Sequence, residues 1–174
     1  MVTKKRLRIA LVVIMALAFV LLGAGGALAD DTGWKDPSNN VADLGGGFTN
    51  PTRAYDNDDP ADVDDAASVA LTDASASHRY YDYNLGAPDC AIIHGIEVRL
   101  DWWLADDTGT NTMSVELSWD GGTSWTTAKA DSTETIAEHT VILGGATDTW
   151  GQTWTAAQLN NANFRVRVTC TTSG

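Results

Sequence analysis

The densest group of side chains that can bind a metal ion is an acidic stretch early in the chain. Its members are Asp56, Asp58, Asp59, Asp62, Asp64 and Asp65. Calcium takes about six to eight oxygen ligands from flexible loops, and carboxylates at this spacing can supply them. The stretch does not fit an EF-hand, because Pro60 and Ala61 stand where a ligand and the turn glycine are needed. A calcium site and a solvated acidic loop both remain open.

Tryptophan is the second residue type that can bind a ligand, and the chain has seven. Trp103 falls on the polar side of an alternating segment, beside Arg99 and Asp101. An exposed indole there is expected to stack against a sugar ring, with Trp150 and Trp154 as further candidates. The alternative is that a loop or a neighbouring domain covers Trp103, and that the other two pack at the edge of the domain.

Signatures of catalysis are missing from the sequence. His78, His94 and His139 are far apart, and no HExxH or CxxC pattern accompanies them. There is no G-x-S-x-G pattern, and the glycines at 45–47 precede no helical pattern that could hold a phosphate. With 23 acids, a pair of carboxylates for glycoside hydrolysis cannot be assigned. The sequence therefore predicts a protein that is not an enzyme.

The elements that position these residues are expected to be short antiparallel strands. Apolar and polar residues alternate strictly over 96–104, 113–119 and 164–170, which is typical of strands with one buried face. Weaker strand patterns cover 67–71, 78–85, 125–128 and 136–143, and one helical turn is expected at 156–159, capped by Thr155. This spacing predicts an all-β fold, an antiparallel β-sandwich of jelly-roll type.

One hairpin has a turn sequence of its own. Residues 118–125 resemble the Asp-box pattern S-x-D-x-G-x-T-W, with Ser124 in place of the threonine. Asp120 and the two glycines after it favour a tight turn, and Trp125 is expected to pack beneath it. In sialidases this motif lies away from the catalytic site, so we interpret it as structural.

The first 29 residues are typical of a secretory signal. Lys4, Lys5 and Arg8 precede an uncharged apolar run over residues 9–22, which is shorter than the about 20 residues that span a bilayer. Small residues at 27 and 29 then predict cleavage before Asp30. The alternative is an uncleaved N-terminal anchor, which is the one membrane attachment that the sequence suggests. We expect an extracellular or cell-surface protein.

The net charge and the length of the chain limit the possible partners and the number of domains. The net charge is −12, and because four of the bases lie in the first eight residues, the processed chain is more negative still. Such a chain repels nucleic acid and anionic lipid. We divide it into a signal peptide at 1–29, a loop-rich opening segment at 30–66 and a β-sandwich at 67–174, with 30–174 forming one domain. Cys90 and Cys170 form either one disulfide or two buried free thiols.

Two segments resemble a known group of modules. Residues 88–99 resemble an "IPsGAtI-x-GIeV" pattern, and residues 144–166 resemble "GGstDlWG-x-tWt … lN … NFrV". An early "GW-x-nP" pattern fits residues 33–37. These patterns are similar to β-sandwich modules of exported bacterial and archaeal surface proteins and of phage structural proteins. In that group a glycine stands where this chain has Cys90, which favours a disulfide with Cys170.

The resemblance implies a non-catalytic module of surface or adhesion type, often one of several in a longer chain. The group continues into a further strand, so we expect the last strand to lie beyond residue 174. Expected partners are a polysaccharide or neighbouring surface modules, and calcium is the one cofactor suggested. A carbohydrate-binding module of a larger exported protein is the first alternative, and a fragment of a secreted glycosidase is the second.

Overall fold

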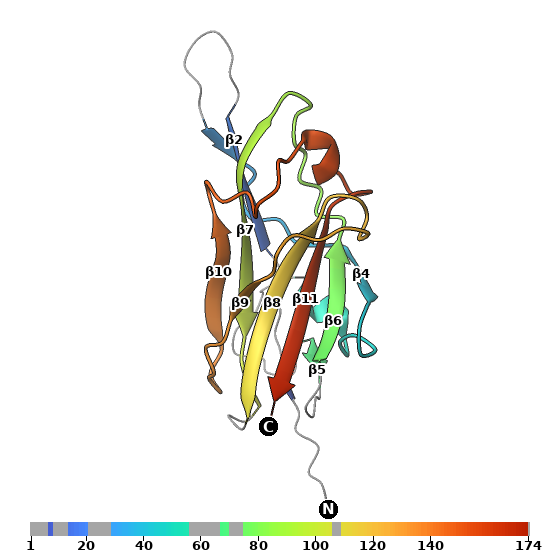
Figure 1. Ribbon diagram of the computed structural model, residues 1–174, viewed down its shortest axis with the longest axis vertical. Helices are drawn as coiled ribbons and strands as arrows, with labels where there is room; N and C mark the ends of the chain where they lie inside the picture. The colour runs from blue at the N-terminus through green and yellow to red at the C-terminus, as the bar shows by residue number, and fades with distance from the viewer. Residues whose placement is uncertain are drawn as a thin grey trace, which may run out of the picture.

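The regular secondary structure of the described residues consists mainly of antiparallel strands (Figure 1). The computed structural model describes residues 7–8, 14–20, 29–55, 67–69, 75–105 and 109–173. Helical structure in these residues is limited to two 3-10 turns, η1 (Pro51–Ala54) and η2 (Ala156–Leu159). None of their helices is long and apolar enough to cross a membrane.

The larger sheet has five strands in the order β4-β6-β11-β8-β9. They are β4 (Asn39–Ala42), β6 (Ser75–Tyr81), β11 (Arg165–Ser173), β8 (Thr110–Ser118) and β9 (Lys129–Asp131). The strand β11 lies at its centre, since Val168 stands opposite His78 of β6 on one side and opposite Val115 of β8 on the other.

The second sheet has four strands in the order β10-β7-β2-β3. They are β10 (His139–Gly145), β7 (Ile92–Trp102), β2 (Ile14–Val20) and β3 (Ala29–Asp31). A small two-stranded sheet joins β1 (Leu7–Arg8) to β5 (Ser68–Val69). All pairings in the three sheets are antiparallel.

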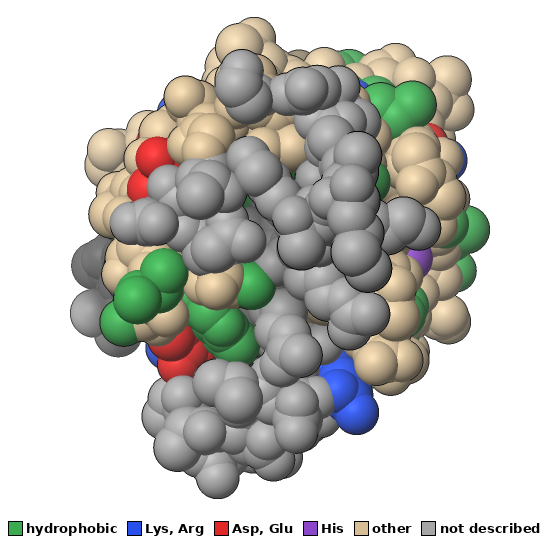
Figure 2. All heavy atoms as spheres, turned by 90° about the horizontal axis from the view of Figure 1, so that it is seen from below, with side chains coloured by type: hydrophobic (Ala, Val, Ile, Leu, Met, Phe, Trp, Pro, Cys, Tyr) green, Lys and Arg blue, Asp and Glu red, His purple; other side chains and the backbone are tan. Residues whose placement is uncertain are grey.

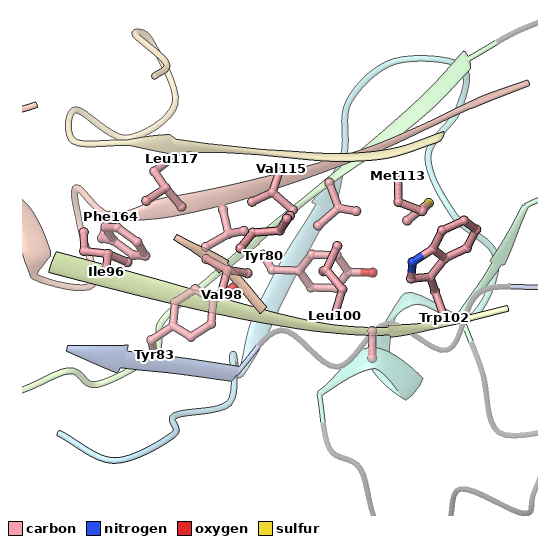
Figure 3. Packing of buried hydrophobic residues seen from close by; sticks show 14 of the residues in the cluster. Tyr80, Tyr83, Ile96, Val98, Leu100, Trp102, Met113, Val115, Leu117 and Phe164 are labelled. Atoms are coloured by element: carbon pink, nitrogen blue, oxygen red, sulfur yellow. The ribbon is translucent and has the colours of Figure 1, made fainter. Parts of the chain in front are cut away.

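The apolar core fills the space between β7 and the strands β8 and β11 (Figure 3). The core-facing side chains of β7 are Ile96, Val98, Leu100 and Trp102, each 0% exposed. Opposite them lie Met113, Val115 and Leu117 of β8, which are also fully buried. Burying each such side chain contributes about 1.5–3 kcal/mol, so these two alternating faces account for much of the stability.

The three strong strand predictions are confirmed. Residues 96–104, 113–119 and 164–170 correspond to β7, β8 and β11, and their predicted apolar faces are buried apart from Trp119, which is partly buried. The turn at η2 is confirmed with the predicted bounds, and the side chain of Gln158 accepts a hydrogen bond from the backbone N–H of Thr155 at 2.9 Å.

The weaker strand predictions are shifted. Residues 125–128 form no strand, and β9 begins only at Lys129, because Thr126 is committed to the preceding turn: its N–H donates to the carbonyl of Leu117. The segment predicted at 78–85 is three residues too late at its start and continues past the end of β6 at Tyr81. The strand β4 lies in the opening segment, where the sequence shows no periodicity.

We expect Leu100→Ala to lower the free energy of unfolding by about 2–5 kcal/mol, because it leaves a cavity in a close-packed core. The matched control is Ile142→Ala on the neighbouring strand β10, where the side chain is 50% exposed. That change should stay within about 0.5 kcal/mol. Urea denaturation measures both, and equal losses for the two variants would contradict the placement of the core.

Candidate functional site

The three tryptophans proposed as ligand platforms are all buried. Trp103 is 7% exposed, so the expectation of an open indole on the polar face is wrong. The neighbouring Asp101 on that face is 1% exposed, and Arg99 binds its carboxylate at 2.9 Å. This end of the outer face of β7 is therefore covered, and it offers no flat surface for a sugar ring.

Trp150 and Trp154 have structural hydrogen bonds that use their only polar atom. The indole N–H of Trp150 donates to the carbonyl of Ile96 at 2.8 Å, and that of Trp154 donates to the carbonyl of Thr149 at 2.8 Å. Trp150 has a left-handed backbone, with φ of 56°, and its ring lies close to the Cα of Gly144. A Cβ on Gly144 would come within 2.6 Å of the indole nitrogen, so a glycine is needed there.

The two cysteines lie far apart, and the expected disulfide is wrong. Cys170 is buried and stands opposite Met113, at the Trp102 end of the core (Figure 3). Cys90 is exposed and precedes Ile92, the first residue of β7. The 11 residues of β7 span about 30 Å, whereas a disulfide needs Cα atoms within about 7 Å. The alternative of two buried thiols fails as well, because Cys90 is exposed.

The six aspartates proposed to bind calcium lie outside the described residues, so calcium binding stays a prediction. Among the described residues, no three His, Cys, Asp or Glu side chains lie close enough together to hold a metal ion.

The hairpin at 118–125 is a self-contained turn. One carboxylate oxygen of Asp120 accepts the backbone N–H groups of Thr123 at 3.0 Å and Ser124 at 2.8 Å. These hydrogen bonds lower the pKa of Asp120, against a smaller opposing effect of desolvation. Trp125 packs beneath the turn on the guanidinium of Arg167, 4.1 Å from the ring centre. All of these contacts are internal, which agrees with a structural role.

His139 and Asp131 form the one histidine–carboxylate pair among the described residues. The imidazole Nε2 lies 2.9 Å from Asp131, whose same oxygen accepts the indole N–H of Trp102 at 2.8 Å. Desolvation raises the pKa of Asp131, but hydrogen bonds from His139, Thr133 and Trp102 outweigh it and lower the pKa overall. The pair joins β9 to β10 and β7. The hydroxyl of Thr133 donates to the other carboxylate oxygen of Asp131 at 2.9 Å.

His78 fixes the opening segment to the larger sheet. Its Nδ1 accepts the backbone N–H of Phe48 at 3.0 Å, so the ring proton is on Nε2, which lies 2.8 Å from the side-chain oxygen of Asn40. The ring is 3% exposed, and this burial lowers its pKa to about 4, against a smaller opposing effect of Asp43. Gly47 must be a glycine, because a Cβ there would lie 2.5 Å from Nδ1.

An open cavity lies where two loops meet beside η2. Its volume is about 360 Å³, and it is lined by Asn84, Leu85, Gly86, Ala87, Ala156, Leu159, Asn160 and Asn161. The floor is apolar, since Leu85 and Leu159 are 4% and 2% exposed. None of these lining side chains is ionisable, so the cavity as described suits a neutral polar molecule.

Two asparagines shape the rim of this cavity. The backbone N–H of Asn84 donates to the side chain of Asn161 at 3.0 Å, and the side-chain amide of Asn161 donates back at 2.8 Å. Asn84 adopts a left-handed backbone, with φ of 51°, which asparagine tolerates better than most residues. This site does not follow from the sequence patterns above, where its one signal is the run of asparagines at 160, 161 and 163.

The comparisons with known proteins add no relative. No family model, curated protein or solved structure matches this chain. Its function must therefore be argued from its own residues.

We expect the stability of the protein to rise as the pH increases from about 4 to 6.5. The pKa of His78 is lower in the folded chain, so the unfolded chain binds more protons in this window and acid favours unfolding. The contribution is on the order of 3 kcal/mol, fully present above about pH 6.5. Chemical denaturation across this range measures it.

The control for this pH dependence is His94→Gln, since His94 is exposed on β7. This variant should retain the slope, and His78→Gln should lose most of it. A slope that both variants retain would contradict the assignment to His78.

In the folded protein we expect a maleimide to label Cys90 and to leave Cys170 unmodified. Burial raises the pKa of the Cys170 thiol to about 12. Until the chain unfolds, the reagent therefore cannot reach this sulfur, and the sulfur is not in the reactive thiolate form. Mass spectrometry after tryptic digestion identifies the labelled site. Equal labelling of both cysteines without denaturant would disagree with this structure, as would recovery of a Cys90–Cys170 peptide from the untreated protein.

Proposed function

We propose that this chain is an exported, non-catalytic surface module whose two larger sheets form a β-sandwich of jelly-roll type. The observation that carries the proposal is the neutral cavity at Asn84 and Asn161. Its lining offers amide groups beside two leucines and holds no acid, base or nucleophile. The indoles of Trp150 and Trp154, which could have formed another site, are buried and hydrogen-bonded to the backbone. The basic start, the apolar run and the small residues before Asp30 support export.

The net charge of −12 is in keeping with this role. A strongly acidic surface keeps a protein soluble and disfavours contact with anionic lipid or nucleic acid. Figure 2 shows that at one end of the molecule acidic side chains lie directly beside a small group of hydrophobic ones. We therefore expect such a module to bind neighbouring surface modules through specific contacts, and not through nonspecific attraction to a charged surface.

A carbohydrate-binding module is the second candidate, and the same cavity favours it. Amide groups beside an apolar floor can hydrogen-bond hydroxyls while the floor contacts the C–H groups of a sugar. Among the described tryptophans, Trp34 is the most exposed, at 39%. Each net hydrogen bond contributes only about 1 kcal/mol, so binding at a single site would be weak and useful affinity would require several copies.

We expect cells that express the full chain to release or display a protein whose N-terminal residue is Asp30. The reason is that peptidases of the export pathway cut after small residues at the −3 and −1 positions. Cell fractionation followed by N-terminal sequencing measures this. A charged residue at position 27, as in Ala27→Asp, should block processing. A protein that stays in the cytoplasm at full length would contradict export.

On a glycan array with the module presented in many copies, we expect binding to neutral glycans that falls about tenfold in Asn161→Ala, because one to two hydrogen bonds are lost. The matched control is Asn39→Ala, an exposed asparagine on β4 outside the cavity. Absence of glycan binding by the wild type would exclude the carbohydrate-binding candidate. Binding that Asn161→Ala retains in full would exclude this cavity as its site.

A further inference from the structure

The strand β7 has two edges, and each is occupied differently. On one side β10 pairs with it from His139↔Trp102 to Gly145↔Ile96. On the other side β2 pairs with it from Ile14↔Arg99 to Val20↔Ile92. Without β2, this second edge would present a row of unpaired N–H and C=O groups along most of an 11-residue strand.

The strand on this second edge is the apolar run of the proposed signal peptide. The bond that is expected to be cut, between Ala29 and Asp30, lies in β3, and these two residues stand opposite Val20 and Phe19 of β2. A peptidase needs the backbone of its substrate free, so this pairing and cleavage exclude each other. If the signal is removed, which is the part of the proposed function on which this inference rests, β7 loses the neighbour that it has here.

The register of β2 indicates which kind of strand can pair with the second edge of β7. Met15 stands opposite Val98, and Leu17 stands opposite Ile96; both residues of β7 are 0% exposed core residues. The intervening Ala16 stands opposite Glu97, on the outer face of β7. Directly opposed residues of antiparallel strands lie on the same face of the sheet. Every second residue of a strand in this place therefore stands opposite a core residue of β7, as positions 15 and 17 do here, whereas positions 14 and 16 stand opposite Arg99 and Glu97.

A β-bulge keeps a residue of β2 opposite a buried residue of β7 near the start of β7. The register shifts between Ala18 and Phe19, so that Ala18 stands opposite Gly95 and Phe19 stands opposite Ile93, which is 6% exposed. Gly95 lies tightly against β10, because a Cβ there would be 2.1 Å from the carbonyl oxygen of Gly145. The irregularity is therefore built into β7, and any strand that pairs here must accommodate it.

We propose that the second edge of β7 is a strand-acceptor site, and that in the processed protein it takes an extended segment of a second polypeptide with large apolar residues at alternate positions. Strand addition of this kind gives affinity through backbone hydrogen bonds and specificity through alternate side chains. A second processed copy cannot supply residues 14–20, because it has lost them too. The acceptor edge is thus the surface through which this module joins a different chain.

The test uses the secreted, processed protein and a synthetic peptide of residues 12–22 with lysines added at both ends for solubility. We expect saturable binding and a peptide-dependent rise in Tm, since a ligand of the folded state stabilises it by mass action. Two matched peptides differ at adjacent positions. Leu17→Lys should weaken the Kd at least tenfold, because position 17 stands opposite the core residue Ile96, and Ala16→Lys, opposite Glu97, should stay within about threefold.

The same pair of substitutions in the full chain, produced without export, gives a second readout. Leu17→Lys should lower the Tm, and Ala16→Lys should leave it unchanged within about 2 °C. No peptide binding by a protein that begins at Asp30 would overturn the acceptor site and leave export standing. A secreted protein that still carries residues 14–20 would overturn cleavage, and with it the need for a second chain. Equal binding of both altered peptides would overturn the register.

Discussion

The structure depends on the burial of one alternating face of β7. Ile96, Val98, Leu100 and Trp102 are completely withdrawn from solvent and form one side of the core, and the matching faces of β8 and β11 form the other. A shift of one residue in any of these strands would turn its apolar side chains to water, so the register is strongly specified. Two hydrogen bonds attach other segments to this strand. The indole N–H of Trp150 donates to the carbonyl of Ile96, and the indole N–H of Trp102 donates to the carboxylate of Asp131.

The same face explains what could be predicted from the sequence. A period of two identifies which residues of a strand share a face, and it correctly selected the buried sides of β7, β8 and β11. It does not say what covers the other face. Trp103 was correctly excluded from the core-facing set, yet it is buried, because burial of an outer face depends on segments distant in the sequence. Cys170 has the predicted orientation, but the end of the strand at which it lies follows from the register of β11, which the sequence alone does not specify.

The candidate site could not be predicted for a related reason. Asn84 and Asn161 are 77 residues apart, and only the pairing of the strands before and after them brings their amides together. The residues that look chemically distinctive in the sequence, the tryptophans and the histidines, are the ones that the core and the joints between sheets use. The two surfaces that we propose for recognition are the neutral cavity, which has few distinctive residues, and the backbone of an edge strand, which has no sequence signature of its own.

An edge that needs a partner is compatible with a module that works in an assembly. In the described structure β11 is paired on both sides within the larger sheet, whereas β7 owes its second neighbour to residues 14–20. Hydrogen exchange followed residue by residue on the processed protein tests this difference most directly. The account predicts slow exchange at the amides of residues 165–171 of β11, and over residues 96–102 of β7 an alternation in which the amides facing β10 are slow and those facing the open edge are fast. Uniform slow exchange along β7 in a chain that begins at Asp30 would contradict it.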